Sequence, residues 1–564
     1  MTTPAASPRA VASDTPDASD TLGTATAPAP PQPTRRQWLG RLAGAALGTA
    51  AAGATAAVPG ADDHAAPAPR AGATPDPIVL MPAWQLSREI AARRVSCREV
   101  MAAYLTHIDR VNPVANAIVA RRDSELLLRE AAAADAALAS SQRAGQRPGW
   151  MHGMPQAPKD LALTRGIRTT FGSPIFRDNV PTQDAIIVER ARRAGAILLG
   201  KTNTPEFGLG SQTFNPVYGA TRNPYDPARC AGGSSGGAAA ALALRLLPVA
   251  DGSDFGGSLR NPAGFCNVYG MRPSMGRVPY GPTPEVFLQQ LGYEGPMGRT
   301  VADVALLLAT QAGPDPRTPL ALERDPALAA LTPDNVQAAL AADLKGKRVA
   351  WLGDWNGYLP MEDGILPLCE QALQAFPAFG VAVEGIAPPF APERLWKAWL
   401  THRHFLVGNG MLPFYRDPAK RALLKADAIW EIEGALQLSG NDVYHASVER
   451  SAWLDTLDRL FTRFDYIAVP TAQVFPFDVN QPWPKSIAGR PMDTYHRWME
   501  VVFPWTLSGC PTISVPVGFG SNGLPMGMQL IGRPRGDLSV LRLARAYEQE
   551  RDWVGRHLPR AMLG

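Results

Sequence analysis

The chain has 564 residues, of which 46% are hydrophobic and 19% are charged. This composition is rich enough in apolar side chains for a large core and excludes a wholly disordered, collagen-like or coiled-coil protein. The 55 basic and 51 acidic residues give a net charge of +4, so composition offers no reason to expect a nucleic-acid partner. Five cysteines are too few for a disulfide framework.

The first 77 residues hold twelve of the 54 prolines, nearly twice the proline density of the rest. Arg35 and Arg36 precede a weakly apolar run, rich in alanine and glycine, that ends near Val58. An arginine pair before such a run resembles a twin-arginine export signal. Because Arg41 interrupts the run, we expect no stable membrane insertion.

These features divide the chain into two predicted parts. Residues 1–77 form a signal peptide and a disordered tether, and residues 78–564 form the folded domain. The prediction places the mature protein in the periplasm or outside the cell and makes the export machinery one of its partners. Composition leaves homo-oligomer formation and the state of the cysteines open.

From residue 78 onward, helical and strand patterns alternate. The spacing of apolar residues predicts helices over 82–92, 97–111, 184–194 and 238–247. Short apolar runs predict buried strands over 196–199, 348–352, 466–469 and 512–517. This alternation is typical of an α/β protein with a central sheet covered by helices on both faces.

Two short motifs match known patterns in an unsuitable context. Gly195–Thr202 fits the phosphate-loop pattern, but a helix precedes it and its middle is itself a predicted strand. Gly232–Gly236 fits the nucleophile elbow of α/β-hydrolases, although Pro224 and Pro227 argue against the central strand that an elbow needs. An esterase that uses Ser234 nevertheless stays open, because candidate histidine bases follow it: His402, His404, His445 and His496.

His402 and His404 have the separation of some metal-ligand pairs. No third ligand lies at a familiar spacing, so polar or capping histidines are the better interpretation. We expect neither a metal nor a cofactor.

The strongest signal is a series of four blocks between residues 153 and 279. They are Met154–Asp160 (MPQAPKD), Gly200–Phe207 (GKTNTPEF), Gly232–Gly237 (GGSSGG) and Gly252–Pro262 (GSDFGGSLRNP). Together they resemble the amidase signature family, and further likeness lies at 112–117, 295–303 and 509–516. The resemblance covers nearly the whole mature chain, with a signature core at about 150–280 and a variable, substrate-shaping region at about 280–460.

The resemblance implies one large domain around a mixed central sheet, and a catalytic unit made of Lys159, Ser234 and Ser258. Ser258 is the nucleophile, and Ser234, after a cis bond to Gly233, passes the proton to Lys159. A single hydroxyl can do this because it both donates and accepts. Lys159 is a base only when neutral, so desolvation, helped by neighbouring positive charge, must lower its pKa from about 10.4.

The loop before Ser258 is expected to hold the negative charge that develops on the substrate carbonyl. Glycines there allow backbone N–H groups to converge on the oxygen, and the expected donors are Phe255, Gly256 and Gly257. Asp254, Arg260 and Gly233 are expected to surround the catalytic groups and hold them in position.

Leu161 and Phe255 depart from the common family pattern and leave the substrate open. The Asp160-Leu161 pair and the Leu259–Pro262 segment resemble variants in hydrolases of nylon-type cyclic amides and other unusual amides. Aromatic residues near the C-terminus suggest either an apolar pocket or ordinary core packing: Trp483, Trp498 and Trp505. Cys266, close to Ser258 in sequence, is either a pocket-wall residue or a small core residue.

The resulting hypothesis is an exported amidohydrolase that acts on a small-molecule carboxamide, with esters, urethanes, anilides or cyclic amides as further substrates. The main alternative within the family is the amidase-like subunit of a tRNA-dependent amidotransferase, which works in the cytoplasm and is therefore disfavoured by an export signal. A silent binding protein is disfavoured because Lys159, Ser234 and Ser258 are all present.

Overall fold

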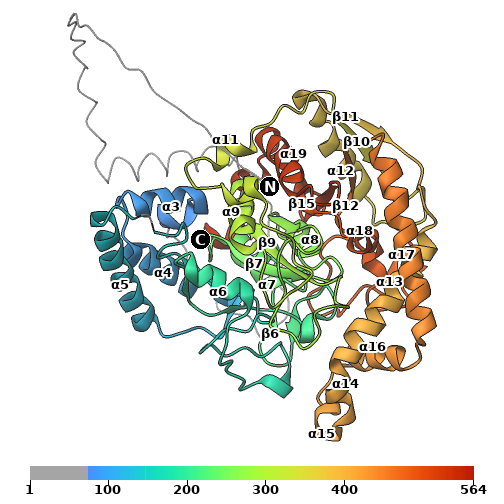
Figure 1. Cartoon of the computed structure of the whole chain (residues 1–564), viewed down its shortest axis with the longest axis horizontal. Coiled ribbons are helices and arrows are strands. Elements are labelled where there is room, and N and C mark those ends of the chain that lie inside the picture. Colours follow the sequence, from blue (N-terminus) through green and yellow to red (C-terminus); the bar gives the residue numbers. More distant parts are fainter. Residues whose placement is uncertain (1–73, 147, 564) are drawn as a thin grey trace, which may run out of the picture. The chain divides into compact units, whose positions relative to one another are not determined.

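The computed structural model describes residues 74–146 and 148–563, and Figure 1 shows how their helices and strands are arranged. The predicted export signal, and nearly all of the tether predicted up to residue 77, lie outside the described residues. The first described helix, α2 (Pro77–Leu80), begins at the predicted boundary, where the Asp76 carboxylate accepts from the Ile78 amide. Within the described residues, no helix is both long enough and apolar enough to cross a bilayer.

An eight-stranded sheet forms the centre of the fold. Its spatial order is β11 (Ala382–Gly385), β10 (Arg348–Trp351), β12 (Tyr466–Pro470), β16 (Pro525–Ile531), β15 (Thr512–Phe519), β8 (Tyr269–Arg272), β9 (Tyr293–Gly298) and β7 (Ala250–Asp254). β10 pairs in parallel with β11 and β12, and the other neighbours pair antiparallel. The predicted α/β class and mixed central sheet are therefore confirmed.

The middle of the sheet is buried on both faces. Every residue of β12 and β16 is buried, which explains why these strands are almost continuously apolar instead of alternating. Helix α8 (Arg260–Phe265) packs against β8, β15 and β16, and α7 (Gly236–Ala243) packs against β7 and α8. Two further helices, α9 (Val301–Gln311) and α19 (Asp537–Glu550), pack together and against β9 and β15 (Figure 1).

The predicted N-terminal helices are present with slightly different ends. They are α3 (Ala83–Ala91), α4 (Cys97–Ala115), α6 (Ile186–Arg193) and α7, which ends at Ala243, short of the predicted 247. A capping box fixes the start of α4, because the Ser96 hydroxyl accepts from the Glu99 amide and the Glu99 carboxylate accepts from the Ser96 amide.

The remaining helices surround the core, and those between residues 392 and 461 lie together along one side in Figure 1. In this region α13 (Pro392–Arg403) passes through a π-helical turn (His404–Gly408) into α14 (Asn409–Arg416), followed by α15 (Pro418–Arg421), α16 (Ala426–Leu436) and α17 (Gly440–Phe461). The others are α5 (Ser124–Arg143), α10 (Pro326–Ala329), α11 (Val336–Leu340), α12 (Ile365–Leu373), α18 (Phe503–Ser508) and α20 (Trp553–Arg556).

The strand predicted over 196–199 forms, but it lies outside the central sheet. β3 (Ile197–Leu198) pairs only with β2 (Pro155–Gln156), in parallel. A second small sheet pairs β4 (Lys201–Thr202) with β1 (Ile118–Val119). Further two-stranded sheets pair β5 (Phe214–Asn215) with β6 (Gly219–Ala220) and β13 (Ser486–Ile487) with β14 (Arg490–Pro491).

The small sheets position the first signature block. A single bridge joins Lys159 to Thr202, and the Thr202 amide donates to the Pro158 carbonyl at 3.0 Å. The segment between the two glycines of Gly195–Thr202 is thus a strand preceded by helix α6, which confirms that the phosphate-loop match is accidental.

Candidate active site

The three predicted catalytic residues come from separate blocks and meet at one place. Lys159 follows β2, Ser234 lies just before α7, and Ser258 lies in the turn between β7 and α8. The Lys159 Nζ donates to Ser234 Oγ at 2.7 Å, and Ser234 and Ser258 line the same cavity, with a volume of about 350 Å³. The sequence blocks therefore converge on one site.

Lys159 is buried, with 1% of its surface exposed. Burial lowers the pKa of its ammonium group to about 7, although the carboxylates of Asp254, Asp251 and Glu294 act in the opposite direction. Desolvation is thus the cause of the lowered pKa of Lys159. A lysine with this pKa is partly neutral near pH 7 and can accept a proton.

Two serines that sequence reasoning missed also contact the Lys159 amine. Nζ lies 2.9 Å from Ser235 Oγ and 3.1 Å from Ser253 Oγ. Both serines stand inside the signature blocks, but only the folded geometry shows that their hydroxyls reach Lys159. They hold the amine in the position from which it reaches Ser234.

Asp251 fixes the backbone of the Lys159 segment to β7. Its Oδ2 accepts from the Lys159 amide at 3.0 Å, and its Oδ1 accepts from Gln156 Nε2 at 2.9 Å. Because all three residues are buried, this cross-link is protected from water.

The Gly233–Ser234 peptide bond is cis, as the family resemblance implies. The Gly233 carbonyl accepts from Ser211 Oγ at 2.5 Å. A Cβ at Gly233 would lie 3.0 Å from the Ser211 carbonyl carbon, so this contact needs glycine.

One of the three amides predicted for the oxyanion hole is already in use. The Gly257 amide donates to Asp254 Oδ1 at 2.9 Å, because Asp254 caps the turn that carries Ser258. Within the described residues, the amides of Phe255, Gly256 and Ser258 have no acceptor. Two of the predicted donors, Phe255 and Gly256, therefore have free amides in this loop, together with the neighbouring amide of Ser258.

Asp254 and Arg260, the two charged residues predicted to support the site, form a buried ion pair next to the loop that carries Ser258. Arg260 Nε lies 2.9 Å from Asp254 Oδ2, Arg272 Nη1 lies 3.3 Å from Oδ1, and none of the three side chains is exposed. Burial alone would raise the pKa of Asp254, but the two guanidinium groups outweigh it and hold that pKa well below its ordinary value. The carboxylate stays ionised and keeps the loop in one conformation.

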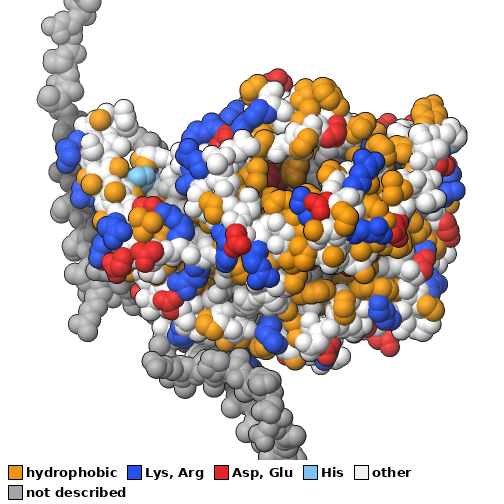
Figure 2. Space-filling view, turned by 90° about the horizontal axis from the view of Figure 1, so that it is seen from below, with side chains coloured by type: hydrophobic (Ala, Val, Ile, Leu, Met, Phe, Trp, Pro, Cys, Tyr) orange, Lys and Arg blue, Asp and Glu red, His pale blue; other side chains and the backbone are white. Residues whose placement is uncertain are grey.

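The wall of the catalytic cavity is mainly apolar. The rings of Phe207 and Phe414 stack with centroids 5.8 Å apart, and Phe176 packs edge-on against both. On the face seen in Figure 2, hydrophobic side chains gather around a hollow. The apolar lining residues are Leu161, Phe171, Phe176, Phe207, Leu209, Phe255, Leu406, Val407, Met411 and Phe414.

The two positions that depart from the family pattern, Leu161 and Phe255, both face this cavity. The tryptophans do not: Trp498 and Trp505 are fully buried in the core, and Trp483 is outside the lining. Cys266 is also a core residue, and all five cysteines are buried free thiols. Residues of the region 280–460 contribute to the wall, and a role for this region in shaping the substrate site stays a prediction.

Sequence reasoning missed an ion pair that reaches the cavity from α13. Arg403 Nε donates to Glu431 Oε1 at 2.9 Å, and Nη2 donates to the Tyr495 hydroxyl at 2.9 Å. The Arg403 guanidinium lies 4.8 Å from the centre of the Phe255 ring, and Arg403 lines the cavity. No sequence signal links Arg403 with Glu431, because each stands in a different, weakly patterned helix.

In the described residues, none of the four candidate histidines is hydrogen-bonded to Ser234, and His445 is exposed to solvent. His404 Nδ1 lies 2.8 Å from Glu431, His496 is buried near the same carboxylate, and burial lowers the pKa of His402 to about 4. Since Ser234 Oγ bonds to Lys159 instead, the esterase alternative lacks its catalytic pair. No cluster of His, Cys, Asp or Glu suited to a metal ion occurs in the part of the chain that the structure describes.

Comparison with known proteins gives a consistent result. A model of the protein family described as Amidase matches residues 99–541. An acylamidase of Rhodococcus erythropolis is 35% identical over 479 residues, which cover 84% of this chain and 96% of that protein. A glutamyl-tRNA(Gln) amidotransferase subunit from Thermosynechococcus vestitus is 34% identical over 496 residues, covering 83% and 98%.

Solved structures resemble this fold over most of its length. A bacterial aryl acylamidase of the amidase signature enzymes superimposes with a TM-score of 0.78 at 28% identity, covering 86% of this chain and 99% of that one. A 6-aminohexanoate cyclic dimer hydrolase, solved with its substrate, superimposes with a TM-score of 0.74 at 25% identity, covering 86% and 100%.

Proposed function

Since the chain belongs to the amidase signature family and is an amide-hydrolysing enzyme, we propose that it acts through an acyl-enzyme on Ser258, with Ser234 as the proton relay and Lys159 as the base. The observation that carries this proposal is the 2.7 Å contact between Lys159 Nζ and Ser234 Oγ, in a cavity that Ser258 also lines. The lowered pKa of Lys159, about 7, supports its role as a base.

In the first half-reaction, neutral Lys159 takes the proton of Ser234 while Ser234 takes that of Ser258. Ser258 Oγ attacks the amide carbonyl, and the free amides of the Phe255–Ser258 turn donate to the oxygen as it becomes negative. Collapse breaks the C–N bond, and the proton on Lys159 returns through Ser234 to the departing amine. Water then attacks the ester on Ser258 by the same relay and releases the carboxylic acid.

The substrate that fits this cavity is an amide with an aryl or alkyl group next to the scissile bond. Phe176, Phe207 and Phe414 offer ring faces and edges for such a group. The acylamidase and aryl acylamidase relatives support an anilide or another acyl amide. Esters, urethanes and cyclic amides are secondary substrates in this proposal.

The proposal includes export. Arg35 and Arg36 ahead of the weakly apolar run support a twin-arginine signal that places the enzyme in the periplasm or outside the cell. Fractionation of cells that express the full chain should find activity outside the cytoplasm. The double substitution Arg35→Lys and Arg36→Lys should trap the activity inside.

The catalytic proposal is tested by burst kinetics and intact-protein mass spectrometry with an activated anilide. Wild type should give a covalent acyl adduct, which a peptide map places on Ser258. Ser258→Ala should lose the adduct and the turnover, and Ser234→Ala should lose most of the turnover while remaining folded. An adduct on Ser234 would refute the assignment of Ser258 as the nucleophile. L-Glutamine, assayed as a second substrate, tests the likeness to the amidotransferase subunits.

A further inference from the structure

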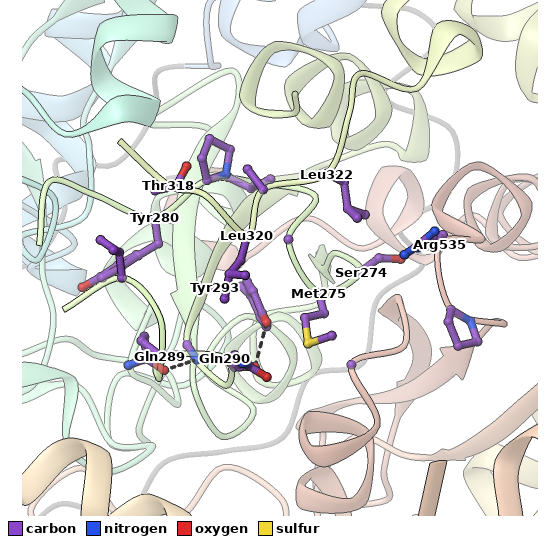
Figure 3. A pocket seen from close by; sticks show the side chains of 18 of the residues that line it. Ser274, Met275, Tyr280, Gln289, Gln290, Tyr293, Thr318, Leu320, Leu322 and Arg535 are labelled. Carbon is purple, nitrogen blue, oxygen red and sulfur yellow. Dashed lines mark hydrogen bonds between the residues drawn. The ribbon is translucent and has the colours of Figure 1, made fainter. Parts of the chain in front are cut away.

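A second cavity, with a volume of about 400 Å³, lies beside the catalytic one and has no part in the mechanism above (Figure 3). The two cavities share four lining residues, Tyr280, Gln289, Gly292 and Tyr293. These four residues, which we call the partition, therefore border both cavities.

Hydrogen bonds within the segment hold the partition in place. The Tyr293 hydroxyl donates to the Gln290 carbonyl at 2.7 Å, and Gln289 Oε1 accepts from the Gly292 amide at 3.1 Å (Figure 3). A Cβ on Gly292 would lie 3.3 Å from Phe255, so the partition touches the loop that carries Ser258. Arg272, which also bonds to Asp254, lies 4.7 Å from the centre of the Tyr293 ring.

The second cavity is mainly apolar and opens through an apolar rim. Lone exposed hydrophobic residues are ordinary on a protein surface, but a cluster around one cavity is not. Four large hydrophobic side chains of the wall are 40–49% exposed. Two more, which are 63% and 56% exposed, lie between the wall residues Val286 and Gln289. These residues are Met275, Tyr280, Leu320 and Leu454, and then Phe287 and Leu288.

The charged groups of the lining do not favour an ionic ligand. They are Glu285 and Arg535. The Glu285 carboxylate already accepts from the amides of Phe287, Leu288 and Gln289 at 2.7–2.8 Å. Arg535 is exposed to solvent. A ligand in this cavity would therefore be held by burial of apolar surface.

We propose that this second cavity receives the apolar arm of an elongated amide substrate whose scissile bond lies at Ser258. The inference rests on the proposed function and adds a substrate class to it: amides with an unbranched alkyl or alkyl-aryl arm too long for the catalytic cavity. The arm passes along the partition, whose residues Tyr280, Gln289, Gly292 and Tyr293 line both cavities. The shared lining connects the two sites, and the apolar rim lets the arm enter from outside.

The test is a homologous series of 4-nitroanilides with acyl chains from acetyl to dodecanoyl, assayed with the full-length enzyme. A second series of N-alkyl benzamides lengthens the amine side and shows which half of the substrate carries the arm. Once the chain passes the partition, kcat/KM should rise by about threefold to fourfold per buried methylene in one of the series. Flat profiles in both series would overturn the proposal.

Val286→Trp and Leu320→Trp fill the second cavity from positions that do not line the catalytic one. Each should lower kcat/KM at least tenfold for the long-chain substrate and less than twofold for the acetyl anilide. Leu320 is 49% exposed, so its variant should fold even if Val286→Trp does not. Val180→Trp, at an exposed position outside both cavities, is the matched control and should change neither value.

An equal loss for short and long substrates in both filled variants would refute the second cavity as a binding site while leaving the catalytic proposal standing. Absence of any hydrolysis by wild type, or normal turnover by Ser258→Ala, would instead refute the proposed function. The two failures are thus distinguishable.

Discussion

The guanidinium of Arg403 lies over the ring of Phe255, 4.8 Å from its centre, and so joins the last residue of α13 to the loop that carries Ser258. The cation is balanced from behind by Glu431, which has no exposed side-chain surface. Arg403 therefore connects the helical region 392–461 to the loop that carries Ser258, through its contact with the Phe255 ring.

Arg403→Met should destabilise the protein by about 3–5 kcal/mol, because the buried Glu431 carboxylate loses the guanidinium that balances its charge. Urea unfolding followed by tryptophan fluorescence measures the loss. The double variant Arg403→Met with Glu431→Leu removes both charges and should recover most of the stability. If the double variant is as unstable as the single one, packing and not charge explains the role of Arg403.

The activity should depend on the protonation of Lys159. Burial lowers the pKa of its amine to about 7, and only the neutral amine takes a proton, so kcat/KM should rise with pH through about 7 and then level off. A neutral anilide keeps the substrate from titrating over this range. A rising limb centred near the ordinary lysine value of about 10.4 would exclude Lys159 as the base.

The three central residues of the candidate site could be predicted because the family blocks mark Lys159, Ser234 and Ser258 one by one. The groups around them could not, since their contacts join positions far apart in the chain. Arg403 meets Glu431 from another helix, and nothing in either local pattern indicates an ion pair. Likewise, the use of the Gly257 amide by Asp254 follows from the fold of the turn, which the glycine pattern alone does not specify.

Only some strands of the central sheet could be predicted, because the others do not have the local sequence pattern of a strand. Runs such as 466–469 and 512–517 are apolar and β-branched, and both are strands. β7 and β9 were not predicted, because segments that contain glycine are more typical of turns than of strands. In the fold these glycines permit close approach: a Cβ on Gly295 would lie 2.5 Å from the Met271 carbonyl oxygen, and one on Gly252 would lie 2.6 Å from Ser235 Oγ.

Gly257→Ala should remove activity and destabilise the nucleophile loop. Its Cβ would lie 2.0 Å from Asn261 Oδ1, and its φ of +92° is unfavourable for alanine. Gly357→Ala is the matched control, because it has a φ of +80° but no atom within 4 Å of the added carbon. The control should lose only about 1 kcal/mol of stability, and its kcat should stay unchanged. Comparable losses of stability in both variants would mean that the loop accommodates the methyl group.

Lys159→Met should remain folded, lose turnover at least a thousandfold, and change how stability depends on pH. The folded wild type releases the Lys159 proton near pH 7, while the unfolded chain keeps it to about pH 10.4. Between these values the unfolded state binds more protons, so the stability of wild type should rise with pH relative to the variant, by about 1.4 kcal/mol per pH unit. Denaturant unfolding of both proteins at pH 7, 8 and 9 measures the difference. A constant difference across this range would mean that the buried amine keeps its proton, and the relay would then lack its base.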